Sequence, residues 1–308
     1  MKRMLIAVAA LSFVAADAAA QSITVTLLGT GSPAPVIDRF GPSTLVEAGP
    51  EKLLFDAGRG ASQRLWQQGM PLRVVTAVFI THLHSDHIVG LPDLWLTGWT
   101  APAYGQRKTP LPVFGPRGTK AMMEHLREAY AEDIRIRMED EHLPPQGVVV
   151  DAQDVTAGVV YDHNGVKVTV FTVDHGPAVR PALGYRVDHG GHSVVIVGDT
   201  RYTDNVASAA RGSDVLIYPM VLTSPDSPMA ATVRLHFTPP EDAGRIFDRV
   251  KPKLVVYNHI LVLGDPPPAL QDMVTRTRRS YAGPLEIGED LMRIEIGDRV
   301  DVDHPARR

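Results

Sequence analysis

Cysteine is absent from this 308-residue sequence. Disulfide bonds, thiolate metal ligands and a cysteine nucleophile are therefore excluded, and a bound metal ion would have to be held by His, Asp or Glu side chains. Beyond the N-terminal segment, the sequence also lacks an apolar run long enough to span a membrane.

An excess of basic residues is lacking as well, because 31 Lys and Arg stand against 35 Asp and Glu, for a formal net charge of −4. Proteins that bind nucleic acid usually carry a basic patch. The composition therefore weakly disfavours a polynucleotide substrate, although a local patch would be compatible with it. The 44% hydrophobic and 21% charged content is ordinary for a globular protein, and the length allows one large domain or two small ones.

The first twenty residues differ in pattern from the rest. Lys2 and Arg3 precede an apolar run over residues 4–16, and Ala18-Ala19-Ala20 forms an A-x-A site before Gln21. This pattern is typical of a secretory signal peptide. We therefore expect a signal peptide over residues 1–20, a mature domain over 21–308, and a bacterial protein that is periplasmic or secreted. A retained N-terminal anchor is the alternative.

Short strand-like runs alternate with helical patterns from Ser22 onward. Apolar periodicity predicts helices over 61–68 and 119–135, and a capping box with proline predicts a third helix that begins at Thr238. The remaining runs predict strands over 23–28, 44–48, 52–55, 75–80, 166–173, 183–187, 194–197, 215–218 and 253–257. This alternation favours an α/β fold in which helices surround two sheets.

Three histidines and a carboxylate are packed into six residues, from His82 to His87. Imidazole and carboxylate bind zinc and similar divalent ions. In a segment with a period of two, His82 and His84 fall on the same side and can face one ion. Asp86 and His87 follow the turn, where they can reach a second ion.

Three more polar residues stand at or near the ends of expected strands: His175, Asp199 and His259. Protein sites for hydrolysis often hold two metals about 3.5–4 Å apart, and a carboxylate and a water bridge the pair. Together with the histidine cluster, these residues supply enough ligands for two ions.

The ordered set of motifs resembles the metallo-β-lactamase superfamily. The matching elements are Leu28-Gly29-Thr30-Gly31, Asp56, His82-x-His84-x-Asp86-His87, His175, Asp199 and His259. The resemblance implies a four-layer αββα sandwich and two Zn²⁺ per chain, or other divalent ions. It implies that His82, His84 and His175 hold the first metal, that Asp86, His87 and His259 hold the second, and that Asp199 bridges them.

Within the superfamily, the chain resembles the branch of tRNA 3′-processing ribonuclease Z and the secreted arylsulfatase-like hydrolases. Residues 113–119 resemble the branch's F-G-P-x-G element, and His236-x-Thr238-x-x-Glu241-x-Ala243 resembles its H-x-T element. The resemblance implies that His236 protonates or stabilises the leaving oxygen. The alternative is that His236 caps the helix that begins at Thr238.

Three observations point away from tRNA. Ribonuclease Z carries an acidic residue where this chain has Tyr218-Pro219-Met220-Val221. The arm that grips tRNA is not evident, and a secreted protein does not meet precursor tRNA. We therefore expect a secreted dinuclear-zinc hydrolase of the arylsulfatase type. A metal-bound hydroxide, oriented by Asp86, would attack a small sulfate or phosphate ester, and no nucleic-acid partner is expected.

Three other functions remain open at this point: a ribonuclease Z-like phosphodiesterase or endoribonuclease, a β-lactamase or lactonase, and a zinc-binding protein without catalysis. Asp86 argues against the last, because a storage site needs no oriented hydroxide. Arg180 is either an anion-binding residue or a solvated loop arginine, and Trp95 and Trp99 either line a pocket or pack in the core. The sequence is compatible with a homodimer but does not define the oligomeric state.

Overall fold

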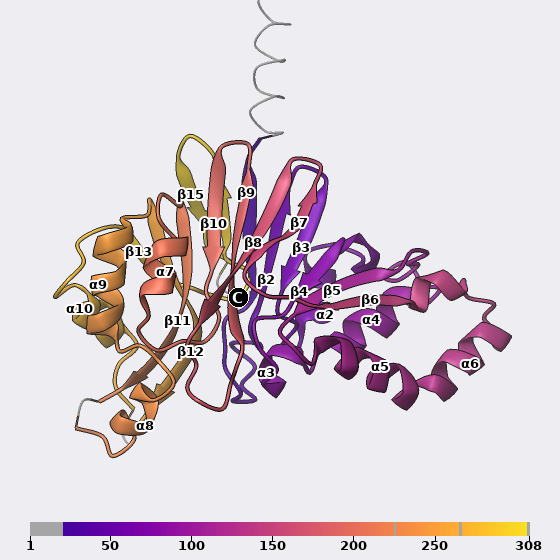
Figure 1. The fold of residues 1–308 in the computed structure, drawn as a ribbon, viewed down its shortest axis with the longest axis horizontal. Coiled ribbons are helices and arrows are strands. Elements are labelled where there is room, and N and C mark those ends of the chain that lie inside the picture. The colour runs from indigo at the N-terminus through magenta and orange to yellow at the C-terminus, as the bar shows by residue number, and fades with distance from the viewer. Residues whose placement is uncertain (1–20, 225, 265–266, 307–308) are drawn as a thin grey trace, which may run out of the picture.

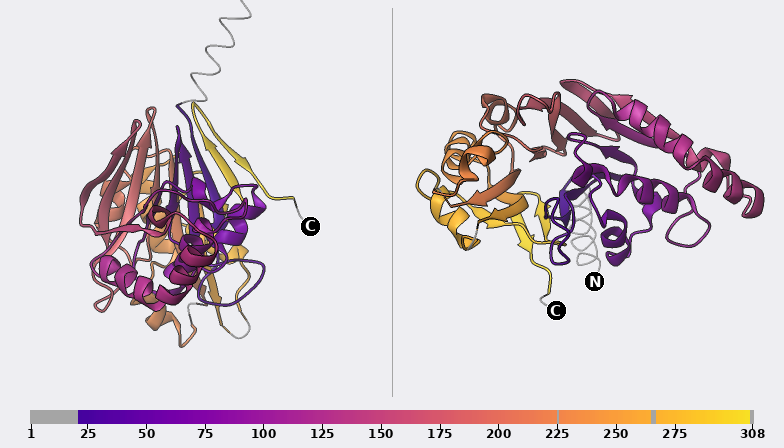
Figure 2. Two further views of the ribbon diagram at one scale, coloured as in Figure 1. Left: turned by 90° about the vertical axis from the view of Figure 1, so that its right-hand side faces the viewer. Right: turned by 90° about the horizontal axis from the view of Figure 1, so that it is seen from below.

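Two β-sheets pack against each other in the computed structural model, and helices cover the outer face of each sheet (Figures 1 and 2). The model describes residues 21–224, 226–264 and 267–306, so the expected signal peptide lies outside the described residues. Within the described part, no helix combines the length and the hydropathy needed to cross a membrane. The four layers confirm the predicted αββα sandwich.

The first sheet has eight strands in the order β15-β14-β1-β2-β3-β4-β5-β6. Its β2 and β3 pair antiparallel, which confirms the expected hairpin, and β3, β4, β5 and β6 run parallel to one another. The bounds are β1 Ile23–Gly29, β2 Ser43–Ala48, β3 Glu51–Phe55, β4 Ala77–Phe79, β5 Leu111–Gly115, β6 Val150–Asp154, β14 Arg293–Ile296 and β15 Val300–Asp303.

The second sheet has seven strands in the order β13-β12-β11-β10-β9-β8-β7. Strands β10 to β13 are parallel neighbours, whereas β7, β8, β9 and β10 form an antiparallel meander. The bounds are β7 Gly158–His163, β8 Val166–Val173, β9 Ala182–His189, β10 His192–Ile196, β11 Val215–Thr223, β12 Leu254–Leu263 and β13 Leu285–Ile287.

The helices divide between the two halves of the chain. The first half carries α2 Ala61–Gln67, α3 Ser85–Ile88, α4 Leu91–Trp99, α5 Thr119–Ala129, α6 Ala131–Asp140 and the 3₁₀ turns η1 Leu72–Val74 and η2 Pro145–Val148. The second half carries α7 Asp204–Ala209, α8 Ala230–Arg234, α9 Pro240–Val250 and α10 Gln271–Thr277. The expected single helix over 119–135 breaks at Tyr130, whose φ of −100° and ψ of 13° are not helical, so that α6 extends away from the sheets (Figure 1).

Three apolar layers follow from this arrangement. Side chains from both sheets form the central layer, α2, α4 and α5 pack on the eight-stranded sheet, and α7, α9 and α10 pack on the seven-stranded one. In the central layer, Phe55 stacks on Phe79 at 4.9 Å and lies 5.4 Å from the Tyr185 ring. Burial of each such aromatic side chain stabilises the fold by roughly 1.5–3 kcal/mol.

Tyr185 also links this core to the chemistry at its edge. Its hydroxyl donates a 2.6 Å hydrogen bond to the carbonyl of Ile80, two residues before His82. The inter-sheet core therefore holds the end of β4 in place, directly before the histidine cluster.

Candidate metal centre

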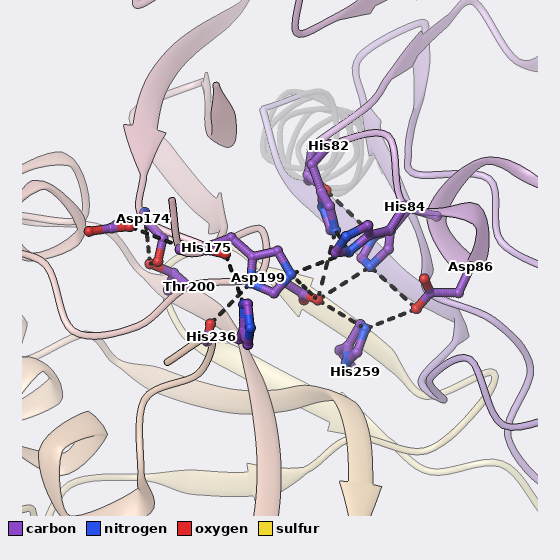
Figure 3. A network of polar contacts seen from close by, with 12 residues as sticks. His82, His84, Asp86, Asp174, His175, Asp199, Thr200, His236 and His259 are labelled. Atoms are coloured by element: carbon purple, nitrogen blue, oxygen red, sulfur yellow. Dashed lines mark hydrogen bonds and ion pairs between the residues drawn. The ribbon is translucent and has the colours of Figure 1, made fainter. Parts of the chain in front are cut away.

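Seven side chains from four parts of the chain converge at one edge of the two sheets (Figure 3). The segment that follows β4 and runs into α3 supplies four of them, and the segments after β8 and β10 and a residue within β12 supply the others. They are His82, His84, Asp86, His87, His175, Asp199 and His259, so the structure brings together every ligand expected from the sequence.

The first group is a set of three imidazoles. The Nε2 atom of His82 lies 3.0 Å from Nδ1 of His84, and Nε2 of His175 lies 3.3 Å from the same Nδ1. His82 and His175 are buried, whereas His84 is exposed. Three ring nitrogens thus face a common point that is open to solvent on one side.

The second group combines one carboxylate with two imidazoles. The Oδ2 atom of Asp86 lies 3.2 Å from Nε2 of His259 and 3.6 Å from Nε2 of His87. All three side chains are buried. They form a second group of potential ligand atoms, and His82, His87 and Asp199 form a third group that links the two.

Asp199 lies between the two groups. Its Oδ2 atom is 3.7 Å from Nε2 of His175 and 3.9 Å from Nε2 of His82 on one side. On the other side it is 3.3 Å from Nε2 of His259 and 3.6 Å from Nε2 of His87. A carboxylate in this position can contact an ion in either group.

A β-bulge places His259, which the sequence had put after the end of a strand. Strand β12 continues to Leu263, and its register with β11 shifts between the Pro219–Asn258 and Val221–Leu261 pairs. His259 adopts a positive φ of 47° within this bulge. A bulge bends a strand and redirects its side chains, which accounts for the approach of this imidazole to Asp86.

Asp56 orients the cluster from behind. The amide and the hydroxyl of Thr81 donate to its carboxylate at 2.8 and 2.9 Å, and Nδ1 of His87 donates to it at 2.8 Å. This bond leaves Nε2 of His87 for a metal, as outer partners of metal-binding histidines commonly do. The sequence motif included Asp56 without assigning it this contact; its place directly after a strand, before a glycine-rich turn, was the available signal.

Burial and neighbouring charges shift the pKa values of several cluster residues in opposite directions. Burial alone would lower the pKa of His87, but the carboxylates of Asp56 and Asp199 outweigh it and raise this pKa well above the usual value. Burial would raise the pKa of Asp199, but His259 and His87 hold it well below its usual range. Burial and the neighbouring imidazole of His87 lower the pKa of His82, which favours the neutral form that metal binding requires.

The residues present fit a divalent metal ion. Among the described residues, Nε2 of His87 is a buried polar atom without a hydrogen-bond partner, and it faces the carboxylates of Asp86 and Asp199. Such atoms are rare in native proteins and call for an explanation, for example a bound ion. Imidazole nitrogens and carboxylate oxygens are the ligands that zinc accepts when thiolates are absent.

His236 lies beside the first group of ligands. Its Nδ1 donates to the carbonyl of His175 at 3.2 Å, and Nδ1 of His175 donates to the carbonyl of His236 at 3.0 Å. The side chain is half-buried and does not cap a helix, because α9 begins after Pro239 without a side-chain cap. The expected capping box is therefore wrong: the hydroxyl of Thr238 donates to the carbonyl of Thr200 instead.

Phe237 is a neighbour of the cluster that sequence reasoning missed. Its ring lies 5.1 Å from that of His175 and 5.8 Å from that of His259. Trp95 and Trp99, in contrast, are fully buried and donate to the backbone carbonyls of Val148 and Pro144. Arg180 is exposed and lines an open cavity of about 470 Å³ together with Asp174 and residues of β8, the 181–182 segment and the 203–205 segment.

Comparison with known proteins agrees with this geometry. Residues 51–260 match the family described as Beta-lactamase superfamily domain. Ribonuclease Z of Mycobacterium bovis (strain BCG / Pasteur 1173P2) is 34% identical over 285 residues, which cover 90% of this chain and 99% of that protein. Ribonuclease Z of Mycobacterium sp. (strain KMS) is 38% identical, over 89% of this chain and 96% of that protein. The crystal structure of the metallo-β-lactamase fold protein YhfI from Bacillus subtilis superposes with a TM-score of 0.72 at 18% identity, and covers 89% of this chain and all of that one.

These relatives overturn two expectations from the sequence: the arylsulfatase-type activity on a small ester, and the exclusion of a nucleic-acid partner. The formal net charge was a weak guide, because a total over the chain says nothing of the field at a metal site. The missing acidic residue was also a weak guide. Met220 is fully buried in β11, and Tyr218 donates a 2.8 Å hydrogen bond to Thr238, so the segment that carries His236 is anchored without a carboxylate there.

Proposed function

Because the chain belongs to the β-lactamase superfamily, in the branch of the ribonuclease Z relatives, we propose that it is a metal-dependent hydrolase that cleaves phosphodiester bonds in RNA. The observation that carries the proposal is the 34–38% identity to proteins named ribonuclease Z over about nine-tenths of the chain. The cluster of His and Asp side chains supplies the site at which the reaction would take place.

We assign two divalent ions, with zinc as the first choice, to the two groups of ligands. His82, His84 and His175 would hold one ion, and Asp86, His87 and His259 the other. Asp199 would bridge them, because its Oδ2 lies within 3.9 Å of an imidazole nitrogen in each group. Bound in this way, divalent ions lower the pKa of a water to near 7 and stabilise charge on the phosphoryl group.

Asp86 is the residue best placed to orient the attacking water and accept its proton. Its Oδ2 faces His259, and the carboxylate retains a second oxygen for another contact. Hydrogen bonding from His259 and the charge of His87 overcome the effect of burial and keep the pKa of Asp86 below its usual value. The carboxylate is therefore ionised at neutral pH, as a general base must be.

His236 is suited to protonate the leaving group. Its Nδ1 is committed to the carbonyl of His175, so Nε2 is the nitrogen that can give a proton. In the proposed reaction the water attacks phosphorus, the bond from phosphorus to one ribose oxygen breaks, and that oxygen receives the proton of His236. The ring of Phe237 packs beside those of His175 and His259, one ligand from each group.

Cleavage of RNA tests the proposal directly. The chain from Gln21 onward is incubated with zinc and with end-labelled RNAs, one of them a precursor tRNA with a 3′ extension, and the products are resolved on a gel. We expect metal-dependent cleavage that chelation abolishes. Asp86→Ala should lower the rate by at least about 10²-fold, because general-base catalysis contributes typically 10²–10⁴-fold.

The matched control is Asp93→Ala, which removes an exposed carboxylate from α4, outside the cluster, and should retain full activity. An aryl sulfate ester serves as the competing substrate. If no RNA is cut while the sulfate ester is hydrolysed, the proposal is wrong. If Asp86→Ala cuts RNA at the unchanged rate, the assigned role of Asp86 is wrong.

A further inference from the structure

A small cavity lies directly behind the metal centre, at the ends of strands from both sheets. Its volume is about 20 Å³, which is enough for one water molecule. Its wall includes the ligands His87, Asp199 and His259, but not His82, His84, Asp86 or His175. The remaining lining residues are Pro42, Ser43, Thr44, Phe55, Asp56, Ile196, Val197, Gly198, Pro219 and Asn258. The cavity is therefore on the inner side of three ligands and separate from the open face of the site.

Besides Nε2 of His87, which faces Asp86 and Asp199 on the metal side, four buried polar atoms of these lining residues have no hydrogen-bond partner among the described residues. They are Oγ of Ser43, Oδ1 of Asn258, Oδ1 of Asp199 and Nδ1 of His259. Each side chain is more than nine-tenths buried. An unpaired polar group in such a place costs roughly 1–3 kcal/mol, so four around one small cavity indicate that a common partner satisfies them.

The hydrogen-bonding capacity of the four atoms matches that of water. Asp199 Oδ1 and Asn258 Oδ1 can only accept, and a water donates two hydrogen bonds. Ser43 Oγ can donate. The Nε2 atom of His259 lies 3.2 Å from Asp86 and so faces the metal side, which leaves Nδ1 of the same ring to donate into the cavity. Two donors and two acceptors complete the coordination of one water, and ordered buried waters typically make about three such bonds.

We propose that this cavity is a structural water site that positions two metal ligands, with Ser43 and Asn258 as the positioning residues. The water would fix the tautomer of His259 by accepting from Nδ1–H, which leaves the Nε2 lone pair for a metal. It would hold the inner oxygen of Asp199, so that the outer oxygen Oδ2 stays between the two ligand groups. The inference concerns metal binding and holds whether or not RNA is the substrate.

Ser43→Ala removes one partner of the water with little change in volume. Ser62→Ala is the matched control, because the Ser62 hydroxyl is also buried and unpaired but does not line the cavity. Zinc affinity is measured without substrate, by competition with a chromophoric chelator. Loss of an outer partner typically weakens metal affinity by about 10–100-fold, so we expect at least about a tenfold loss in Ser43→Ala and none in Ser62→Ala.

Asn258→Leu is the second variant and should weaken zinc binding in the same way. The direct readout is a high-resolution crystal structure of the zinc-loaded wild-type chain. It should show one water at about 2.7–3.1 Å from the four atoms. The proposal is overturned if the cavity is dry, if an ion occupies it at about 2.0–2.2 Å from its ligands, or if both variants bind zinc as tightly as Ser62→Ala.

Discussion

Replacement of Asp56 by Asn tests how the metal ligands are held. The carboxylate is 5% exposed and accepts three hydrogen bonds, two from Thr81 and one from Nδ1 of His87. Asn has nearly the same shape but carries no charge and has a single accepting oxygen. We expect His87 to lose its charge-assisted bond, so that its proton can move to Nε2, the atom that faces Asp86 and Asp199.

The size of the effect follows from these contacts. A hydrogen bond to a buried charged group contributes about 1.5–3 kcal/mol, so loss of the His87 bond and weakening of one Thr81 bond should lower the free energy of unfolding by about 2–4 kcal/mol. Metal affinity at the group of Asp86, His87 and His259 should fall by about 10–100-fold. Asp56 reaches the first group indirectly, through the hydroxyl of Thr81, which lies 3.1 Å from Nδ1 of His82, so metal affinity at that group should fall less.

Chelator competition measures the zinc affinities, and urea denaturation of the metal-free chain measures stability. Asp290→Asn is the control, because Asp290 is 8% exposed and accepts from Thr30 and Phe40 but touches no expected ligand. It should lose stability and keep its zinc affinity. The reasoning is refuted if Asp56→Asn binds zinc as tightly as the wild type, or if Asp290→Asn loses affinity to the same degree.

Three further predictions concern other parts of the chain. Because the pKa of His87 is raised, zinc binding should displace a proton at neutral pH, and zinc affinity should rise with pH until that pKa is passed. Calorimetry in buffers of different ionisation enthalpy should detect the released proton. Equal heats of binding in all buffers would contradict this prediction. Glu241→Ala should destabilise the chain by about 3 kcal/mol in urea denaturation, because the buried guanidinium of Arg276 loses its two bonds to Glu241, at 2.8 and 3.0 Å, and keeps the one to the carbonyl of Thr223. Burial would raise the pKa of Glu241, but Arg276 lowers it. The stability contributed by the Glu241–Arg276 ion pair should therefore be complete above the pKa of the unfolded chain, near 4.5, and be lost as pH falls through the lower pKa of the folded chain. Glu241→Gln should flatten this dependence of stability on pH, and an unchanged profile would count against the ion pair. Finally, the pattern over residues 1–20 predicts export and a mature chain that begins at Gln21, and N-terminal sequencing with cell fractionation checks both. An intact Met1 in the cytosolic fraction would contradict this prediction and would remove the secretion argument against a tRNA substrate.

The residues of the cluster could be named from the sequence because their signal is local. His82, His84, Asp86 and His87 lie within six residues, directly after an apolar run that forms β4. Residues at the ends of strands meet at one edge of a sheet, so His175 and Asp199 were also accessible to this reasoning. The substrate class was not accessible, because net charge and a single missing carboxylate do not describe a substrate-binding surface.

Elements whose form depends on distant partners were missed. The periodicity over 119–135 continues past Tyr130, yet the helix breaks there. Thr238 has the sequence of a cap, but the hydroxyl of Tyr218 and the carbonyl of Thr200 claim its side chain. At Thr238 the local preference gave way to contacts with the second sheet, whereas Tyr130 lies on the side of the eight-stranded sheet, where its ring contacts that of Trp95.

The sequence by itself determined which side chains could hold a metal, since a chain without cysteine must use imidazole and carboxylate. It also determined the alternation of strands and helices, since hydrophobic periodicity is a local property. Only the tertiary structure decided the contacts that make the histidine cluster a site. Asp56 meets His87 across 31 residues, and His259 meets Asp86 across 173. A bulge in β12 and the stacking of the two sheets produce these contacts. They depend on how distant segments pack, which no spacing along the chain specifies.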